Sequence, residues 1–186
     1  MPDITPSLWF DTDGLDAAEF YVSVFPNSAV TRVSYYGDAG PRPAGSVLTV
    51  EFVLDGQPFL AINGGPQFTF DEAVSFTISC ADQDEVDYYW AKLTEGGEEG
   101  QCGWLKDRYG LSWQVVPQGL ADILGDPDPA RAERAMKAML GMRRLDLVAL
   151  RAAADGAPGG AAEGSLGGPS LGGPSPGGPS PGGPVS

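Results

Sequence analysis

The chain has 186 residues, of which 42% are hydrophobic and 19% charged, and its formal net charge at pH 7 is −14. This length is sufficient for one domain with a substantial core. Residues 1–118 contain eighteen Asp and Glu but only five Lys and Arg. Such an acidic domain argues against nucleic-acid binding, because that affinity comes from neutralising phosphates.

The first third of the chain predicts a strand, a helix and three strands. Residues 4–10 are apolar and aromatic, as in a strand, and residues 11–25 place apolar side chains near helical spacing with acids in the first turn. Pro26 and Asn27 end this helix. Residues 28–37 and 46–56 alternate as strands, and Asp55-Gly56 predicts a hairpin into a returning strand over 57–64.

The same order of elements returns after the loop "GGPQFTFDEA". Residues 74–80 predict a strand, and residues 81–97 predict a helix that opens on acids and closes on Gly96-Gly97. A short strand and a hairpin around "RYG" follow, up to Pro117. The acidic start "ADQDEVD" is interpreted as a capped, solvated helix end. We therefore expect an α+β domain over 1–118, built from two similar modules, about 1–66 and 71–118.

Two further regions follow the domain. Residues 119–152 predict a C-terminal helical extension, with apolar residues on a helical period, that packs on the domain or on a partner subunit. Residues 153–186 are rich in Gly, Pro and Ser and repeat "GGPS", a composition typical of disorder. A protein that acts only through this tail as an interaction module is a further alternative.

Cysteine usage and hydropathy bear on location. Cys80 and Cys102 do not form a CxxC pair, and no His is present to activate either thiol, so both are expected to be inert. There is no basic-plus-apolar leader and no run of eighteen apolar residues. These features predict a cytoplasmic protein with neither a membrane nor a nucleic-acid partner.

Several stretches resemble a known superfamily. The doubled module, with "GLDAAEFYVSVFPNS" in its first helix and "KDRYGLSWQVV" in its last hairpin, resembles the vicinal oxygen chelate superfamily of glyoxalase I, bleomycin-resistance proteins and extradiol dioxygenases. "ITPSLWF", "FLAINGGPQFTF" and "KAMLGMRRLDLVALRAA" are more closely similar to its 3-demethylubiquinone-9 3-methyltransferase-like subfamily. The resemblance covers residues 3–152. It implies paired βαβββ modules that form a half-barrel cleft, and a homodimer.

The resemblance also implies where a metal would lie. By pattern, the positions of the superfamily's metal ligands fall on Ser7, Ala61, Ser75 and Gln114. Three of these side chains bind divalent ions poorly or not at all, and the chain has no His, so we expect neither metal nor cofactor. A typical methyltransferase would need a Gly-rich turn after the first strand, where this chain has "DTDGLD".

Seven residues are candidates for a ligand-binding cleft, although each has a structural alternative. The three tryptophans either line an apolar pocket or pack in the core or dimer interface. The loop "NGGPQFTF" either offers amides and aromatic walls or only connects the modules. Gln114 faces either the cleft or solvent. The candidates are Trp9, Asn63, Gln67, Phe68, Trp104, Trp113 and Gln114.

These observations favour a metal-independent small-molecule-binding protein with a sequestering or resistance-like role, since an acidic surface attracts cationic compounds. The alternative is an enzyme, either a divalent-metal lyase or dioxygenase or the 3-demethylubiquinone-9 3-methyltransferase that the subfamily's description states. No residue stands out as catalytic.

Overall fold

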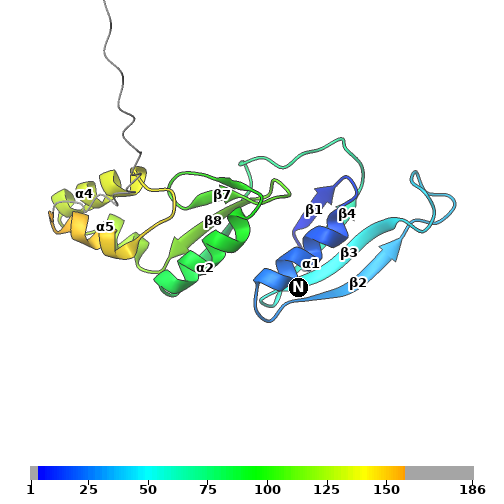
Figure 1. Ribbon diagram of the computed structural model, residues 1–186, viewed down its shortest axis with the longest axis horizontal. Coiled ribbons are helices and arrows are strands. Elements are labelled where there is room, and N and C mark those ends of the chain that lie inside the picture. The colour runs from blue at the N-terminus through cyan, green and yellow to red at the C-terminus, as the bar shows by residue number, and fades with distance from the viewer. Residues whose placement is uncertain (1–3, 158–186) are drawn as a thin grey trace, which may run out of the picture.

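The computed structural model describes residues 4–157 and confirms the α+β class (Figure 1). Each of two modules runs strand, helix, three strands, and three helices follow them. Module one consists of β1 (Ser7–Phe10), α1 (Gly14–Val24), β2 (Ala29–Tyr35), β3 (Val47–Leu54) and β4 (Gln57–Asn63). Module two consists of β5 (Phe76–Cys80), α2 (Gln83–Thr94), β6 (Glu98–Glu99), β7 (Trp104–Lys106) and β8 (Ser112–Pro117). The extension contains α3 (Leu120–Leu124), α4 (Pro129–Leu140) and α5 (Leu147–Ala154).

Each module forms its own four-stranded mixed sheet. The strand orders are β1-β4-β3-β2 and β5-β8-β7-β6. In each sheet the first strand pairs in parallel with the last strand of its module, and the other pairings are antiparallel. Within residues 4–157 the two sheets do not join into a closed barrel. The first strands, β1 and β5, are both edge strands.

Local sequence explains the turns and helix ends. Asp55 and Gly56 both have positive φ (44° and 83°), which suits the two-residue hairpin between β3 and β4. At the start of α2, the Asp82 carboxylate accepts a hydrogen bond from the Glu85 N–H, and the Glu85 carboxylate accepts one from the Ala81 N–H. This reciprocal capping confirms the predicted helix start.

One face of each sheet is covered by a helix and the other is not. α1 packs on β3 and β4, and α2 packs on β7 and β8 (Figure 1). Alternation along the strands therefore places Val50, Phe52 and Ala61 in the core of module one, and Leu105 and Val115 in the core of module two. The face of each sheet that no helix covers remains open. It carries Trp9 in module one, and Trp104 and Gln114 in module two.

The two modules are joined by a buried carboxylate. Asp107, in the turn before β8, is 3% exposed and accepts four hydrogen bonds. Its Oδ1 accepts from the backbone N–H groups of Tyr109 and Leu111, and its Oδ2 accepts from Tyr21 Oη and Trp113 Nε1, both at 2.8 Å. Tyr21 lies on α1, so this one side chain links module one to the last hairpin of module two.

Burial changes the titration of this network. Desolvation raises the pKa of the Asp107 carboxyl, and its four hydrogen bonds act in the opposite direction. Desolvation, and then the Asp107 carboxylate, raise the pKa of the Tyr21 phenol well above its usual range, so the phenol is a donor at neutral pH.

The C-terminal extension packs on module two. The backbone N–H groups of Cys102 and Gly103 donate to the carbonyls of Met142 and Arg143, at 2.8 and 2.7 Å. The Gln83 amide on α2 bonds both the Leu145 carbonyl and the Leu147 N–H. The extension therefore contacts its own domain, which was one of the two predicted arrangements.

Within residues 4–157 no helix is long and apolar enough to cross a membrane. The disordered tail was expected from residue 153, but α5 continues to Ala154, and from position 158 onward the tail lies outside the described residues.

We expect Tyr21→Phe to lower the free energy of unfolding by about 2 kcal/mol at pH 7, because a buried carboxylate loses a charge-assisted hydrogen bond. The folded pKa of Asp107 is raised, so the stability it contributes is present below the unfolded pKa of about 3.9 and is lost as the pH rises through the folded pKa. Removal of the Tyr21 hydroxyl raises the folded pKa of Asp107 further. Tyr21→Phe should therefore lower the free energy of unfolding more at pH 7 than near pH 4.

Urea unfolding at the two pH values measures this difference. Tyr35→Phe is the matched control, because Tyr35 is 59% exposed, and it should change stability by no more than about 0.5 kcal/mol. Equal stability of Tyr21→Phe and the control at pH 7 would show that the Asp107 network does not hold the modules together.

Candidate functional site

The seven candidate residues lie in three separate places. Trp9, Asn63, Gln67 and Phe68 lie around the loop that follows β4, Trp113 lies in the core between the modules, and Trp104 and Gln114 lie on the open face of the second sheet. The fold therefore does not gather them into one cleft within a single chain.

The corner around Trp9 is built by close packing against a glycine. Trp9 Nε1 donates to the Gly65 carbonyl at 2.8 Å, and the Phe68 ring meets the indole edge to face at 5.1 Å. A Cβ on Gly64 would overlap the Trp9 ring. Phe68 is 65% exposed. These two rings border a cavity of about 370 Å³ that Asp11, Asp13, Pro66, Phe70 and Tyr109 also line.

The two amides of the loop differ in their surroundings. Asn63 is 3% exposed; its Oδ1 accepts from the Gly14 N–H at 2.9 Å, and its Nδ2 donates to the carbonyls of Thr12 and Val47. This side chain thus clamps the start of α1 to β4. Gln67 is exposed and its amide lies against Gly65, so of the two it is the amide that faces solvent.

Trp113 belongs to the packed junction between the modules. It is 3% exposed, and its ring stacks on Phe25 at 5.4 Å and contacts Tyr21 and Phe76 at 5.6 Å. This aromatic contact holds α1 against the second sheet. Trp113 also borders a cavity of about 590 Å³ between the modules, beside Phe76 and Tyr89, so both roles considered for the tryptophans stay open for it.

Gln114 and Trp104 are register partners on the open face of the second sheet. Gln114 Nε2 donates to Ser75 Oγ at 2.9 Å, while Oε1 accepts no hydrogen bond from residues 4–157. On the same face, Ser112 Oγ is buried and has no partner in the described part of the chain. It borders a cavity of about 110 Å³ beside Trp104 and the Lys106–Glu72 ion pair of 2.6 Å.

The expected metal positions do not form a ligand set. Ala61 is 1% exposed and faces the core, so the open-face positions of β4 are Leu60 and Ile62, one residue away. Ser75 and Gln114 are bonded to each other. No three His, Cys, Asp or Glu residues within 4–157 are grouped so as to hold a metal ion. The donor chemistry of these positions therefore does not fit a resident divalent ion.

Both cysteines are free thiols. Cys80 is buried, and burial raises the pKa of its thiol to about 11. Cys102 Sγ contacts the Met139 carbonyl at 3.5 Å, where the extension packs.

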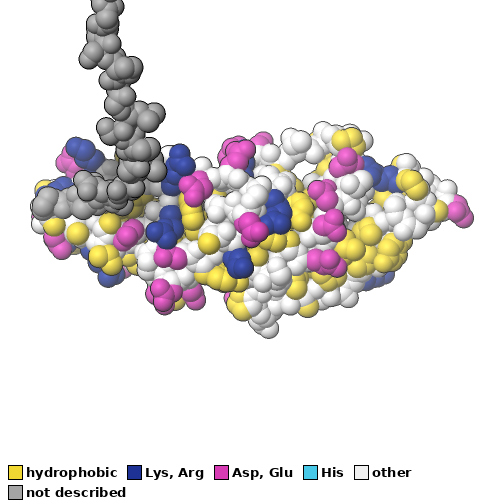
Figure 2. Space-filling view, in the orientation of Figure 1, with side chains coloured by type: hydrophobic (Ala, Val, Ile, Leu, Met, Phe, Trp, Pro, Cys, Tyr) yellow, Lys and Arg dark blue, Asp and Glu magenta, His cyan; other side chains and the backbone are white. Residues whose placement is uncertain are grey.

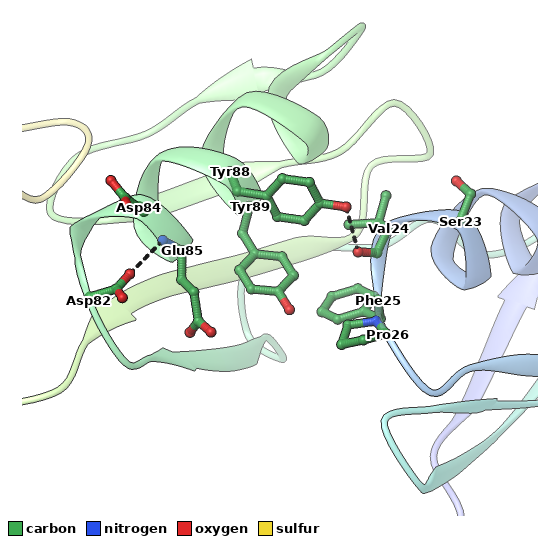
Figure 3. Close-up of a pocket in the computed structure, with 9 residues that line it drawn as sticks. All are labelled: Ser23, Val24, Phe25, Pro26, Asp82, Asp84, Glu85, Tyr88 and Tyr89. Atoms are coloured by element: carbon green, nitrogen blue, oxygen red, sulfur yellow. Dashed lines mark hydrogen bonds between the residues drawn. The ribbon is translucent and has the colours of Figure 1, made fainter.

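A groove that sequence reasoning missed lies where the end of α1 meets the start of α2 (Figure 3). Its volume is about 500 Å³. It is lined by Ser23, Val24, Phe25, Pro26, Asp82, Asp84, Glu85, Tyr88 and Tyr89. The acids and tyrosines of α2 are close together in the sequence. Phe25 and Pro26 lie far from them along the chain and come opposite them only when the modules pack together.

Comparison with known families gives one extensive match. The model of the family described as 3-demethylubiquinone-9 3-methyltransferase matches residues 2–116. No curated protein matches the chain.

Solved structures from several bacteria are similar to this chain. A PhnB protein from Bacillus cereus is 33% identical, with a TM-score of 0.58, over 62% of this chain and 99% of that one. Protein PA1353 from Pseudomonas aeruginosa is 20% identical, with a TM-score of 0.53, over 63% and 98% of the two chains. The fosfomycin resistance protein FosX from Listeria monocytogenes, complexed with Mn(II) and sulfate, is 14% identical, with a TM-score of 0.47, over 67% and 95%.

We expect Gly64→Ala to lower the free energy of unfolding by about 1–3 kcal/mol, because the added methyl group must displace the Trp9 ring from its place against the loop. Gly37→Ala is the control, since a Cβ there meets no atom within 4 Å and its φ is not positive, and it should change stability by less than about 0.5 kcal/mol. Chemical denaturation followed by tryptophan fluorescence makes the measurement. If both alanine variants were equally stable, the corner around Trp9 would be looser than its packing indicates.

Proposed function

Because the chain belongs to the 3-demethylubiquinone-9 3-methyltransferase family and has structural neighbours in the vicinal oxygen chelate superfamily, we propose that it is a metal-independent small-molecule-binding protein of that fold. Its role would be to sequester or neutralise a hydrophobic or aromatic compound. The ligand would lie on the open faces of the two sheets.

The open face of the second sheet supports this proposal most directly. Hydrogen bonding to Ser75 fixes the amide of Gln114 and leaves its oxygen without a partner among residues 4–157. The neighbouring Trp104 is only half-buried. A neutral acceptor beside a partly exposed indole is suited to a flat ligand that carries one donor group.

The open face of the first sheet supports a homodimer. Trp9, Leu60 and Ile62 alternate onto that face and are only partly buried. Among the described strands, β1 and β5 each have one unpaired edge, which favours pairing with another strand. A second copy that brought the first sheet of one chain to the second sheet of the other would form the half-barrel cleft. In such a dimer, Trp9 of one chain would lie in the same cleft as Gln114 of the other.

Enzymatic alternatives fit the residues less well. A divalent-metal lyase or dioxygenase would need ligands, and the corresponding positions carry serines, an amide and apolar side chains. A methyltransferase of the doubly wound type places S-adenosylmethionine at the carboxyl ends of parallel strands. Here each sheet has a single parallel pair, and Asn63 occupies the N-terminal end of α1.

We expect the full-length protein to bind N-phenyl-1-naphthylamine, an uncharged aromatic dye with one N–H donor whose fluorescence rises in apolar surroundings. Gln114→Ala should weaken this binding about 3- to 10-fold, the contribution of one hydrogen bond. Gln118→Ala is the matched control, since Gln118 is exposed just beyond β8, and it should bind as the wild type does. A site at Gln114 would be contradicted if both variants lost the same affinity for the dye, or if neither variant lost any.

Two measurements on the same preparation separate the enzymatic alternatives. We expect elemental analysis to find no stoichiometric Ni, Zn, Mn or Fe, and calorimetry to detect no binding of S-adenosylmethionine. Stoichiometric metal would overturn the metal-independent assignment, and micromolar binding of S-adenosylmethionine would favour the methyltransferase. Sedimentation velocity tests the dimer, and a monomer at all concentrations would remove that part of the proposal.

A further inference from the structure

The groove between α1 and α2 has an aromatic wall. Tyr88 and Tyr89 meet edge to face at 5.1 Å, Tyr89 stacks on Phe25 at 5.2 Å, and Phe25 stacks on Trp113. Tyr88 Oη donates to the Val24 carbonyl at 2.9 Å, which fixes its ring across the gap between the helices (Figure 3). The wall is therefore held in place by both modules and does not depend on a ligand for its shape.

Three carboxylates at the start of α2 lie beside this aromatic wall. Asp84 lies one helical turn before Tyr88, and Glu85 lies one turn before Tyr89, so each acid neighbours a ring on the surface of α2. Asp82 adds a third formal negative charge at the rim. None of these three forms an ion pair within residues 4–157, whereas other acids of the chain do, among them Asp87 and Glu99.

One positive charge lies near the groove, because Lys92 follows Tyr88 by one helical turn on α2. Among residues 4–157 no Lys or Arg lines the groove itself, and α1 has no basic residue in its last turn. The carbonyl end of α1 adds a partial negative charge of about one half. The start of α2 contributes a partial positive charge of the same size, which is small against three carboxylates. The local field therefore favours a cation. Figure 2 shows that acidic side chains, interspersed with Lys and Arg, also lie along the face in view.

The shape distinguishes an organic cation from a metal ion. The carboxylates lie at the rim, and within residues 4–157 they do not converge as ligands around one point. The rings of Phe25, Tyr88 and Tyr89, together with Pro26, make up most of the rest of the lining. A cavity of about 500 Å³ is within the range of small-molecule sites, roughly 300–1,000 Å³. Aromatic faces attract cations, and most strongly those that are weakly hydrated.

We propose that this groove binds a small organic cation with a flat aromatic body, which stacks on the exposed face of Tyr88 and meets Tyr89 edge to face, while Asp82, Asp84 and Glu85 balance its charge. The inference does not depend on the proposed function, because the groove lies at the helix ends and the proposed ligand site lies on the open sheet faces.

The test uses three flat probes of similar size and different charge. N-methylquinolinium is the cation, quinoline the uncharged probe and 2-naphthoate the anion, each titrated into the full-length protein by calorimetry near pH 7.5. We expect N-methylquinolinium to bind at least about tenfold more tightly than quinoline, and naphthoate not to bind. Affinity for the cation should fall when ionic strength is raised from about 0.01 M to about 0.15 M, which shortens the screening length from roughly 30 Å to roughly 8 Å.

The decisive variant is D82N/D84N/E85Q. Asn remains a good N-cap and Gln can retain the capping hydrogen bond, so three charges are removed while the start of α2 is preserved. Its affinity for N-methylquinolinium should fall about tenfold or more. The matched control E19Q/D38N/E133Q removes three exposed acids outside the groove, none of which forms an ion pair among the described residues, and should change affinity less than about threefold.

A second variant tests the aromatic wall separately. Tyr89→Leu keeps an apolar side chain and removes the ring, and it should weaken cation binding several-fold while leaving quinoline binding less affected. Thermal unfolding confirms that each variant is folded, and if Tyr89→Leu does not fold, D82N/D84N/E85Q decides alone. The proposal is overturned if the cation binds no better than quinoline, if D82N/D84N/E85Q binds as the wild type does, or if the control variant loses as much affinity.

Discussion

The buried carboxylate of Asp107 is the interaction on which the arrangement of the two modules depends. It accepts hydrogen bonds from its own turn and from side chains on α1 and β8. A carboxylate taken out of water is costly unless such donors surround it. Because one of them, Tyr21, comes from the other module, the cost of burial is offset only when the modules are docked. The aromatic rings around this group complete the same contact.

This docking decides which surfaces are available for ligands. The helix-covered faces of both sheets meet the shared core, so the faces that carry Trp9, Trp104 and Gln114 point away from it. Among the described residues, Trp9 and Trp104 border two different cavities. The same docking places the end of α1 beside the start of α2, which forms the groove. The proposed ligand site and the cation groove therefore depend on a single packing arrangement and remain separate from each other.

Much of the fold could be predicted because it depends on local periodicity. Alternation along β8 puts Trp113 in the core and Gln114 on the opposite face, and the acidic start of α2 correctly predicted its cap. The predicted position of the metal ligand on β4 was wrong by one residue, since Ala61 faces the core. A shift of one residue reverses the face of every side chain on a strand, and pattern alone does not determine register so finely.

The sequence by itself determined the order of the elements, the family, the acidic charge and the lack of histidine. The family was implied by the resemblance of particular stretches to known proteins, and the other properties follow from residue type or from spacing within a few turns. Only the tertiary structure decided that the Asn63 amide forms hydrogen bonds at the start of α1 and that Asp107 joins the modules. It also decided that Phe25 faces Tyr89. These contacts join residues between 49 and 86 positions apart, and such pairs depend on how the sheets and helices pack, which no local pattern specifies.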